Sequence, residues 1–446
     1  MFLQAIMRPG LAALSCACLL ACIPAQAMDL TQAWQLARDK DPGFRAAAAQ
    51  AAAAREIEAQ AQAALLPNVS VSNSHNQVNL QQTLGTVTTP YQYSSQNTGL
   101  LLRQTLYRKP QFEQLEQSRA QSRAADAELQ RAQLELLGRT AGYYLEVLLA
   151  QDVLAFSRVL LQSTQGLLSA AQRNFDKGQG TRTDIDEAQA RLDMAQAQAL
   201  QASQQVAFTR EQLQSVVSQE VPNMVVRNLP TAQTLPSVGQ DIPEWIERTL
   251  AQHPEMVLSR AKVEAAQAEV KKQNSGHHPT LDLVAQVTRS QGENALNPNS
   301  SYQNRTLGVQ LNWTLYAGGQ TQSAIRQAEA SLLREEELLE QTRRNLSLQV
   351  RKEYQNTTAG LLRVKALEQS QRSSDQMVIS TRKGIQAGTR SQTDLLNALQ
   401  RQAEAGRDLA QSRYQFLLAH LKLQTMAGTD PQQVLQALSA LLDVQP

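Results

Sequence analysis

The side chains best suited to catalysis in this chain are its five histidines, His75, His253, His277, His278 and His420. Only His277 and His278 are neighbours, and adjacent imidazoles could bind a metal ion. Loop histidines at the end of a helix are far more often solvated, so we expect no metal site. The sequence also contains no Gly-rich phosphate loop, no nucleophile elbow and no H-E-x-x-H helix. We therefore expect that the protein is not an enzyme and uses no cofactor.

Acidic side chains stand at two equivalent places in the chain. Asp184 follows Gly178 and Asp394 follows Gly388, and we interpret each glycine as part of a turn. Because acidic residues are favoured in the first turn of a helix, helix capping is one interpretation of both aspartates. A functional role is the alternative, and position alone leaves both open. The three glutamates at 335–337 are interpreted as a solvated helix face.

Charge and composition exclude several classes of protein. The chain has 42 Lys+Arg and 40 Asp+Glu, and this near balance predicts no nucleic-acid partner. Aromatic residues make up only 4% of the chain, while alanine and glutamine are abundant. Such a composition is typical of long helices with thin cores rather than of one globular core. After residue 27 we find no apolar run long enough for a transmembrane helix.

The first 27 residues have the features of an export signal. Arg8 provides a positive charge, residues 11–23 are apolar, and Ala25-Gln26-Ala27 fits a signal-peptidase site. The apolar run is too short to serve comfortably as a membrane anchor. We expect a signal peptide at 1–27 and a mature chain that starts at Met28.

A lipoprotein is the competing interpretation of this segment. Residues 19–22 loosely resemble a lipobox in which Cys22 would carry the lipid, although Leu20 fits that pattern poorly. All three cysteines, at positions 16, 18 and 22, lie within the predicted signal peptide. Cleavage after Ala27 would leave a chain without cysteine, so we expect neither disulfides nor thiolate metal sites.

An internal repeat organises most of the chain. Short motifs occur twice at a nearly constant separation of about 210 positions. The pairs are Asp41-Pro42 with His253-Pro254, Leu66-Pro67 with His278-Pro279, 105–107 with 314–316, Gly178 with Gly388, and 183–185 with 393–395. We predict a first repeat at 28–216, a proline-containing connector at 217–243, a second repeat at 244–428 and a C-terminal tail at 429–446.

Each repeat is expected to begin with two helices and a β-hairpin. Residues 30–40 predict a short helix, Asp41 can cap the next one, and Pro42 fits its first position. That helix should end before Pro67, since the residue preceding a proline disfavours helix. The hairpins are predicted at 69–107, with a polar loop at 81–95, and at 281–316.

Alternation is clearest in the last strand of the second hairpin. One face carries Leu307, Val309, Leu311, Trp313 and Leu315, and the other Gly308, Gln310, Asn312 and Thr314. Apolar and polar faces over about ten residues are typical of outer-membrane strands. An ordinary half-buried hairpin has the same period, and the alternation alone leaves both interpretations open.

A pair of antiparallel helices is predicted after each hairpin. The long helices cover 110–175 and 320–385, each about 100 Å in length, with tips near 176–184 and 386–394. The returning helices carry apolar heptads, which indicate helix-on-helix packing. These positions are Ile185, Ala188, Leu192, Ala195, Ala199, Ala202, Val206, Leu213 and Val216, with Thr209 as an exception, and Leu395, Ala398, Ala405, Leu409, Phe416, Ala419, Leu423 and Met426, with Gln402 and Ser412 as exceptions.

The lengths of the elements have two consequences. The helix from Pro42 and the returning helix together approach the length of the long helix, so each repeat could supply two columns of equal height. Four strands are too few to close a membrane barrel, for which about eight is the minimum. If the hairpins span a membrane, several subunits must share one barrel.

The order of these elements and several motifs resemble the TolC family of outer-membrane efflux and secretion proteins. The resemblance covers nearly the whole mature chain. Its motifs are 30–34 (LTQAW), Asp41-Pro42, 65–67 (LLP), 104–107 (QTLY), and the tip segments 173–184 and 388–394. Each motif is weak alone, but together and in order they are specific.

The resemblance implies a mixed α and β fold, in which long antiparallel helical hairpins form an α-barrel tunnel in the periplasm. Four strands per chain would contribute to a shared, 12-stranded outer-membrane β-barrel of a homotrimer in outer-membrane lipid. The implied partners are a periplasmic adaptor (membrane fusion) protein and an inner-membrane transporter, either an ABC transporter or a proton-driven one. The poor lipobox and the 30–42 pattern look more like members that serve ATP-driven type I secretion.

The resemblance also implies a gate at the helical tips. Family residues that match Arg390 and Asp184, with the Thr183 backbone as an alternative partner, bond between neighbouring hairpins and hold the tunnel shut. An acid that matches Asp394 surrounds the entrance. Two positions depart from the family pattern, because a latch tyrosine is Ile385 here and a second aspartate is Asn397. We expect a weaker latch and a single ring of carboxylates.

Two other functions remain open at this stage. One is the outer-membrane component of a proton-driven multidrug or metal efflux pump. The other, from a different class, is a non-conducting periplasmic coiled-coil adaptor, which would lack the two aromatic-flanked hairpins.

Overall fold

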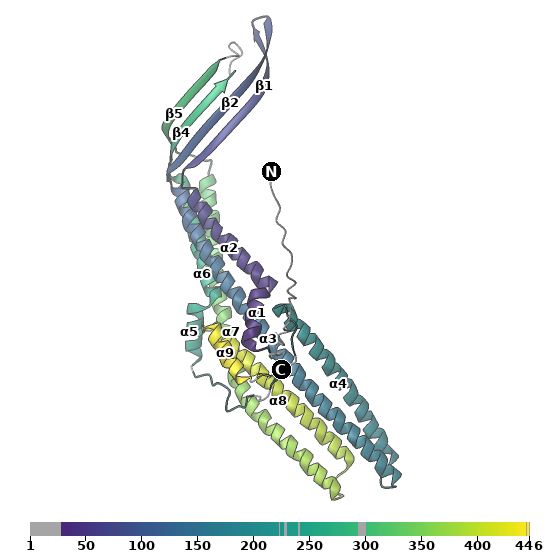
Figure 1. Ribbon diagram of the computed structural model, residues 1–446. Coiled ribbons are helices and arrows are strands. Elements are labelled where there is room, and N and C mark those ends of the chain that lie inside the picture. Colours follow the sequence, from purple (N-terminus) through teal and green to yellow (C-terminus); the bar gives the residue numbers. More distant parts are fainter. Residues whose placement is uncertain are drawn as a thin grey trace, which may run out of the picture.

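The computed structural model describes residues 28–222, 224–226, 230–239, 241–292, 300–442 and 444–445. The predicted signal peptide at 1–27, with Cys22, lies outside these residues. The described chain is elongated, with a four-stranded sheet at one end of a set of long helices and two helical hairpins at the other (Figure 1). Among the described residues, no helix is both long enough and apolar enough to cross a membrane.

The two repeats contain the same elements in the same order. The first consists of α1 (Leu30–Lys40), α2 (Pro42–Ala63), β1 (Asn68–Leu84), β2 (Val87–Arg108), α3 (Lys109–Asp176) and α4 (Arg182–Val217). The second consists of α5 (Ile242–Gln252), α6 (Pro254–Asn274), a 3-10 turn (Ser275–His277), β4 (Thr280–Gln291), β5 (Ser301–Asn312), α7 (Gln320–Gln386) and α8 (Gln392–Met426). The connector adds β3 (Val225–Val226), and the tail adds α9 (Pro431–Leu441) and β6 (Val444–Gln445).

The boundary between α1 and α2 forms as its residues predict. The Asp41 carboxylate accepts a hydrogen bond from the Phe44 amide at 2.7 Å and so caps α2. Pro42 occupies the first turn, where its missing N–H has no cost. The other Asp41 oxygen accepts from Arg139 of α3 at 2.8 Å, so one buried carboxylate both caps α2 and ties it to the long helix.

The sheet joins the two repeats through its central strands. Its order is β1-β2-β4-β5, and every pairing is antiparallel. Leu100 of β2 lies opposite Val287 of β4, so residues of the first repeat pair directly with residues of the second. β1 and β5 are the two open edges.

The hairpins differ from the prediction in two places. The polar loop expected at 81–95 is wrong, because β1 continues to Leu84 and β2 starts at Val87. The segment is polar, but it contains four Thr and two Tyr, which favour strands, and Gly85 at φ +64° allows a tight turn. β5 ends at Asn312, so Trp313 and Leu315 lie beyond it, and the Trp313 indole N–H donates to the His277 carbonyl at 3.0 Å.

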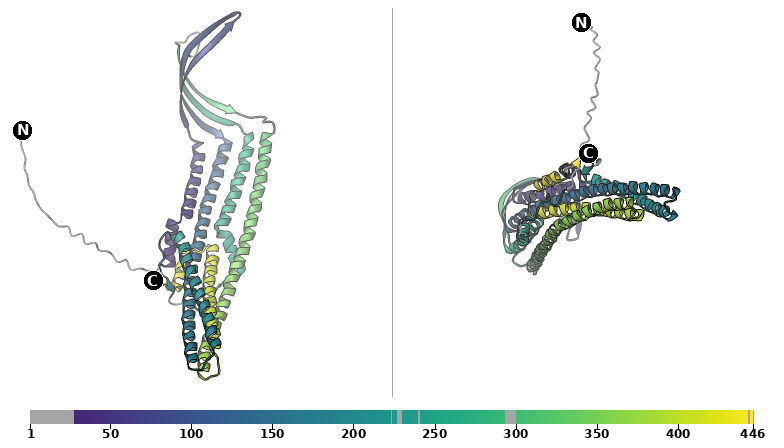
Figure 2. Two further views of the ribbon diagram at one scale, coloured as in Figure 1. Left: turned by 90° about the vertical axis from the view of Figure 1, so that its right-hand side faces the viewer. Right: turned by 90° about the horizontal axis from the view of Figure 1, so that it is seen from below.

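The long helices are arranged as four columns in one curved layer. α2 and α4 both lie along α3, and α6 and α8 both lie between α3 and α7. The order across the layer is therefore α2/α4, α3, α6/α8 and α7 (Figure 2). Each of the two inner columns has neighbours on both sides, whereas α2/α4 and α7 each have one open side.

The heptad seams form the thin cores between the paired helices. On α4 the seam residues from Ala188 to Val216 are buried or partly buried, and the polar exception Thr209 is buried with its hydroxyl donating to the Gln205 carbonyl at 3.0 Å. A larger core lies midway along the helices, where α1 and α9 pack over α3, α4 and α8. There Tyr144 of α3 donates to the carbonyl of Met28 at 2.9 Å and fixes the start of the described chain.

A buried ion pair connects the sheet to the helices. Arg108, at the end of β2, binds Asp282 of β4, with its Nε 2.9 Å from the carboxylate. The Asp282 side chain is only 2% exposed. Removing one partner of such a pair leaves a buried charge without compensation.

Arg108→Ala is therefore expected to destabilise the fold by about 3–5 kcal/mol. Denaturant unfolding of the detergent-solubilised protein measures the loss. Arg108→Ala combined with Asp282→Ala should recover much of it, because no charge then stays buried. A single variant as stable as wild type would show that the pair does not stabilise the junction.

His253 caps α6 at the position that Asp41 holds in the first repeat. Its ring accepts from the Glu255 amide at 3.3 Å, and burial lowers its pKa to about 4. The unfolded chain takes up a proton near pH 6.5 and the folded chain only near pH 4, so stability should fall as pH decreases through this window. The loss is up to about 3 kcal/mol.

His253→Asn should flatten this pH dependence, since asparagine also caps helices but does not titrate. Unfolding curves at pH 7 and pH 5 make the comparison. Burial also lowers the pKa of His420. The unfolding free energy of the variant should therefore still depend on pH, but less steeply than that of wild type. An unchanged slope in the variant would exclude His253 as a source.

Candidate functional site

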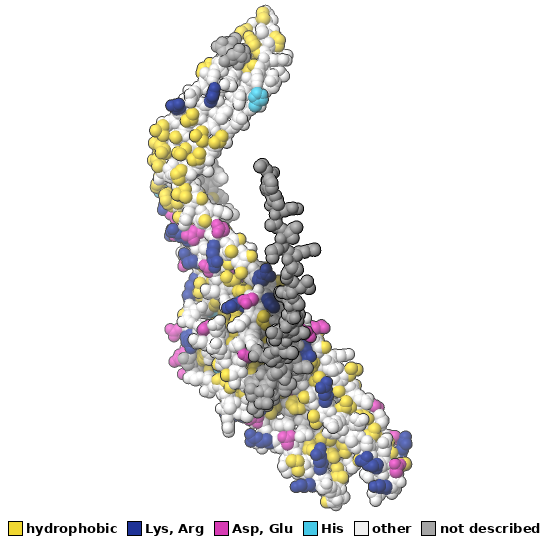
Figure 3. Space-filling model, in the orientation of Figure 1, with side chains coloured by type: hydrophobic (Ala, Val, Ile, Leu, Met, Phe, Trp, Pro, Cys, Tyr) yellow, Lys and Arg dark blue, Asp and Glu magenta, His cyan; other side chains and the backbone are white. Residues whose placement is uncertain are grey.

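The first functional surface is an apolar face of the sheet. Residues opposite each other on neighbouring antiparallel strands share a face, so the register assigns each side chain to one side. One side carries Val69, Val71, Leu100, Leu102, Leu281, Leu283, Ala285, Val287, Leu307, Val309 and Leu311. Val71 and Leu307 are each 74% exposed. The apolar band covers the part of the sheet next to the helices (Figure 3).

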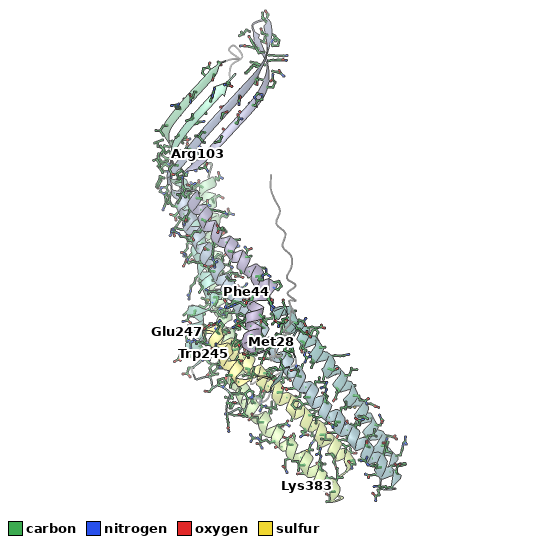
Figure 4. The ribbon with its side chains drawn as sticks, in the orientation of Figure 1. Met28, Phe44, Arg103, Trp245, Glu247 and Lys383 are labelled. Carbon is green, nitrogen blue, oxygen red and sulfur yellow. The ribbon has the colours of Figure 1, made fainter. Side chains whose placement is uncertain are left out.

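The opposite face of the same strands is mostly polar or small. One row contains Ser72, Gly99, Thr288 and Asn304 opposite one another on successive strands, and another contains Asn68, Arg103, Val284 and Gly308. In Figure 4, Arg103 lies at the end of the sheet next to the helices. A sheet with one exposed apolar face and one polar face is the pattern of outer-membrane strands, with lipid on one side and water on the other.

The second functional surface consists of the tips of the two helical hairpins. Gly178 and Gly388 adopt positive φ angles of 72° and 73° in equivalent turns. Thr181 is the N-cap of α4, and Asp184 completes a capping box by accepting from the Thr181 amide at 2.8 Å. Asp394 completes the same box at α8 by accepting from the amide of the N-cap Ser391 at 2.9 Å. The capping interpretation of both aspartates therefore holds within one chain.

The caps also influence protonation. Hydrogen bonds from Thr181 lower the pKa of Asp184, and hydrogen bonds from Ser391, with a smaller effect of the Arg390 charge, lower the pKa of Asp394. Both carboxylates therefore stay charged to a lower pH than free aspartate. The stabilisation from each cap is present at neutral pH and is lost as pH falls through the lowered pKa.

Arg390 and Thr183 are exposed at the tips. The aliphatic part of Arg390 folds over Gly384 of α7, where an added Cβ would lie 2.6 Å from the arginine Cγ. Among the described residues of this single chain, no ion pair joins Arg390 to Asp184. Lys383 lies on the last turn of α7, near the same tip (Figure 4).

Contacts between the two hairpins include residues that the sequence did not single out, namely Arg191, Gln400 and Glu187. Arg191 of α4 donates to Gln400 at 2.9 Å and to Asn397 at 3.1 Å, both on α8. Thr393 donates to Glu187 at 3.0 Å. The departures from the family pattern thus have local roles: Asn397 accepts a hydrogen bond from the other hairpin, and Ile385 packs against an apolar cluster.

The two open edges of the helical layer also carry exposed apolar side chains. On α7, Leu348 and Leu362 are 66% and 65% exposed and are separated by two heptads. On α4, Leu200 and Phe208 are 62% and 54% exposed. Large apolar side chains on both edges indicate surfaces that are covered in an assembly.

No group of three potential metal ligands occurs in the part of the chain that the structure describes. His277 and His278 lie at the end of α6 and its 3-10 turn, and His75 on the exposed β1 strand. The described residues thus combine an apolar sheet face, a curved helical layer and polar tips.

Comparison with known proteins identifies the class. The family model described as "Outer membrane efflux protein" matches residues 33–218 and 245–429. The chain belongs to this family of outer-membrane channels, which confirms the predicted resemblance, fold class and outer-membrane location.

Individual relatives match over most of their lengths. The alkaline protease secretion protein AprF of Pseudomonas aeruginosa is 31% identical, covering 93% of this chain and 87% of that protein. The proteases secretion protein PrtF of Dickeya chrysanthemi is 28% identical over 95% and 93%. The outer membrane protein TolC of Vibrio cholerae is 29% identical over 94% of each. The solved structure of CusC shares the fold, with a TM-score of 0.78, 16% identity and coverage of 91% and 93%.

Proposed function

We propose that this protein is the outer-membrane exit channel of a type I secretion system and carries polypeptides out of the cell. The observation that carries the proposal is the exposed apolar face of the sheet, placed directly on a curved layer of helices about 100 Å long. Similarity to AprF and PrtF, which are named for protease secretion, supports polypeptide as cargo. A non-conducting adaptor would have no use for an apolar sheet face.

The proposed assembly is a homotrimer. Four strands with two open edges cannot close a barrel alone, whereas three copies supply the 12 strands of a closed one. In the helical layer, the α7 edge of one copy would meet the α2/α4 edge of the next. The exposed leucines of α7 and the exposed Leu200 and Phe208 of α4 would be buried by this contact.

The proposed gate lies at the tips. Within one chain Asp184 and Asp394 are caps, but each keeps a free carboxylate face at the tip, and the exposed Arg390 is available to a neighbouring hairpin. Arg390 would bind Asp184 or the Thr183 backbone of an adjacent hairpin in the resting state. Three copies of Asp394 would form one acidic constriction at the entrance.

The proposed partners are a periplasmic adaptor and an inner-membrane ABC transporter. Crosslinking followed by co-purification should identify the transporter. Deletion of the gene for this protein should then abolish secretion of the polypeptide that this transporter exports. The purified protein should also form cation-selective channels in planar bilayers. If the protein conducts but crosslinks to a proton-driven pump, the channel proposal stands and the secretion proposal is replaced by efflux.

A further inference from the structure

A second charged feature lies between α7 and α8, well away from the tips. A groove with a volume of about 420 Å³ is formed there, and Ser412, Phe416 and Ala419 of α8 form its buried floor. Gly360 of α7 lines the groove next to Phe416, and a Cβ at this position would lie 3.4 Å from the Phe416 ring.

The rim of the groove is positively charged. Lys352 and Arg363 of α7 and Lys422 of α8 line it, and all three side chains are exposed. Among the described residues, none of the three forms an ion pair. The carboxylate among the lining residues, Glu353, is buried and accepts a hydrogen bond from Asn356 at 3.2 Å. The groove therefore carries three exposed cations against one buried carboxylate.

The groove lies on the concave side of the helical layer. On α8, Leu417 and Leu421 pack into the core that α9 completes, whereas Ala419 and Lys422 project from a different face. α9 lies on the convex side of the layer (Figure 2). On α7, Arg351 faces a separate groove beneath α5, and Lys352, one residue later, faces this one. In a closed ring of subunits the concave side is the wall of the tunnel.

The distance between the cations of the groove indicates how long a ligand must be to contact them together. Lys352 and Arg363 are 11 positions apart on one helix, about 17 Å along its axis. A small anion cannot contact both, but an extended peptide spans this distance with about five residues. Carboxylates along such a peptide match the row of cations.

We propose that the α7–α8 groove is a binding site for acidic segments of the exported polypeptide during transit. This proposal rests on the proposed function, because it needs the concave side to be a conducting wall. Exposed charges bind weakly and reversibly, and several weak contacts in three copies hold a passing chain without trapping it. Such contacts should weaken as salt concentration rises.

Fluorescence anisotropy with a labelled ten-residue polyglutamate tests the site on the detergent-solubilised protein. The triple variant Lys352→Gln, Arg363→Gln and Lys422→Gln should raise the apparent Kd at least about tenfold at low salt. The control removes the same number of cations from the groove beneath α5: Arg260→Gln, Arg343→Gln and Arg351→Gln. The control should bind the peptide as wild type does, and free glutamate should not compete.

Two outcomes would overturn the proposal: equal binding by wild type and the groove variant, or an equal loss in the control variant, which would indicate only the overall charge. Single-channel recordings of the same preparations report on the proposed function separately. Any block of wild-type channels by polyglutamate should be weaker in the groove variant and unchanged in the control variant. A protein that conducts without groove-dependent binding would retain the channel function and lose this inference.

Discussion

Leu348→Glu combined with Leu362→Glu is expected to convert the assembled protein into monomers. Both leucines lie on the open side of α7, and burial of each would stabilise an interface by about 2 kcal/mol. Glutamate removes this contribution and adds a desolvation cost in every copy. Native mass spectrometry in detergent should show trimers for wild type and monomers for the variant.

Val159→Glu provides the control. Val159 is 60% exposed on α3, a column that already has neighbours on both sides within the chain. This variant should remain trimeric. Trimers of the double leucine variant would mean that α7 does not contact the next subunit, and the proposed order of columns around the ring would be wrong.

Arg390→Ser together with Asp184→Ala is expected to open the channel. Three copies of the Arg390–Asp184 bond would act on one closing motion, so their loss should raise mean conductance in planar bilayers on the order of tenfold. Asp394→Ala should lower cation selectivity and relieve block by divalent ions, because a ring of carboxylates on an axis concentrates cations.

Loss of the helix caps could imitate these effects, so Thr181→Ala and Ser391→Ala serve as controls. Each removes the hydroxyl partner of a cap and leaves the carboxylate in place. These variants should conduct and select as wild type does. If they behave like the aspartate variants, or if the aspartate variants behave like wild type, the tip residues are caps and the gate lies elsewhere.

Local signals in the sequence were sufficient for the helices. Asp41 and Pro42 marked the boundary between α1 and α2 because capping and the proline ring act within a few residues. The seam on α4 was readable because burial repeats with the heptad, and even Thr209 could be buried, since its hydroxyl bonds to its own helix. The polar residues at 81–95 led to the wrong prediction of a loop. A strand with water-accessible faces needs no apolar residues.

Contacts across long separations were not predictable in the same way. Nothing near Arg108 in sequence specifies Asp282 as its partner, since the pairing of β2 with β4 brings them together. The bonds from Arg191 to Asn397 and Gln400 depend equally on how two hairpins pack side by side. The gate candidates came from resemblance, and their pairing between subunits remains a prediction.

The pairing of β2 with β4 also sets the order in which the molecule can form. Leu100 and Val287 are about 190 positions apart, and β3 with β6 joins segments about 220 positions apart. A chain that emerges from its N-terminus can build α1 to α4 early, but its first hairpin then has an unpaired β2 edge and an apolar face exposed to water. Such non-local contacts slow folding and favour aggregation of the incomplete chain. A periplasmic holdase should therefore be needed most during the interval between export of the two repeats, and depletion of it should yield aggregated chains rather than misassembled trimers.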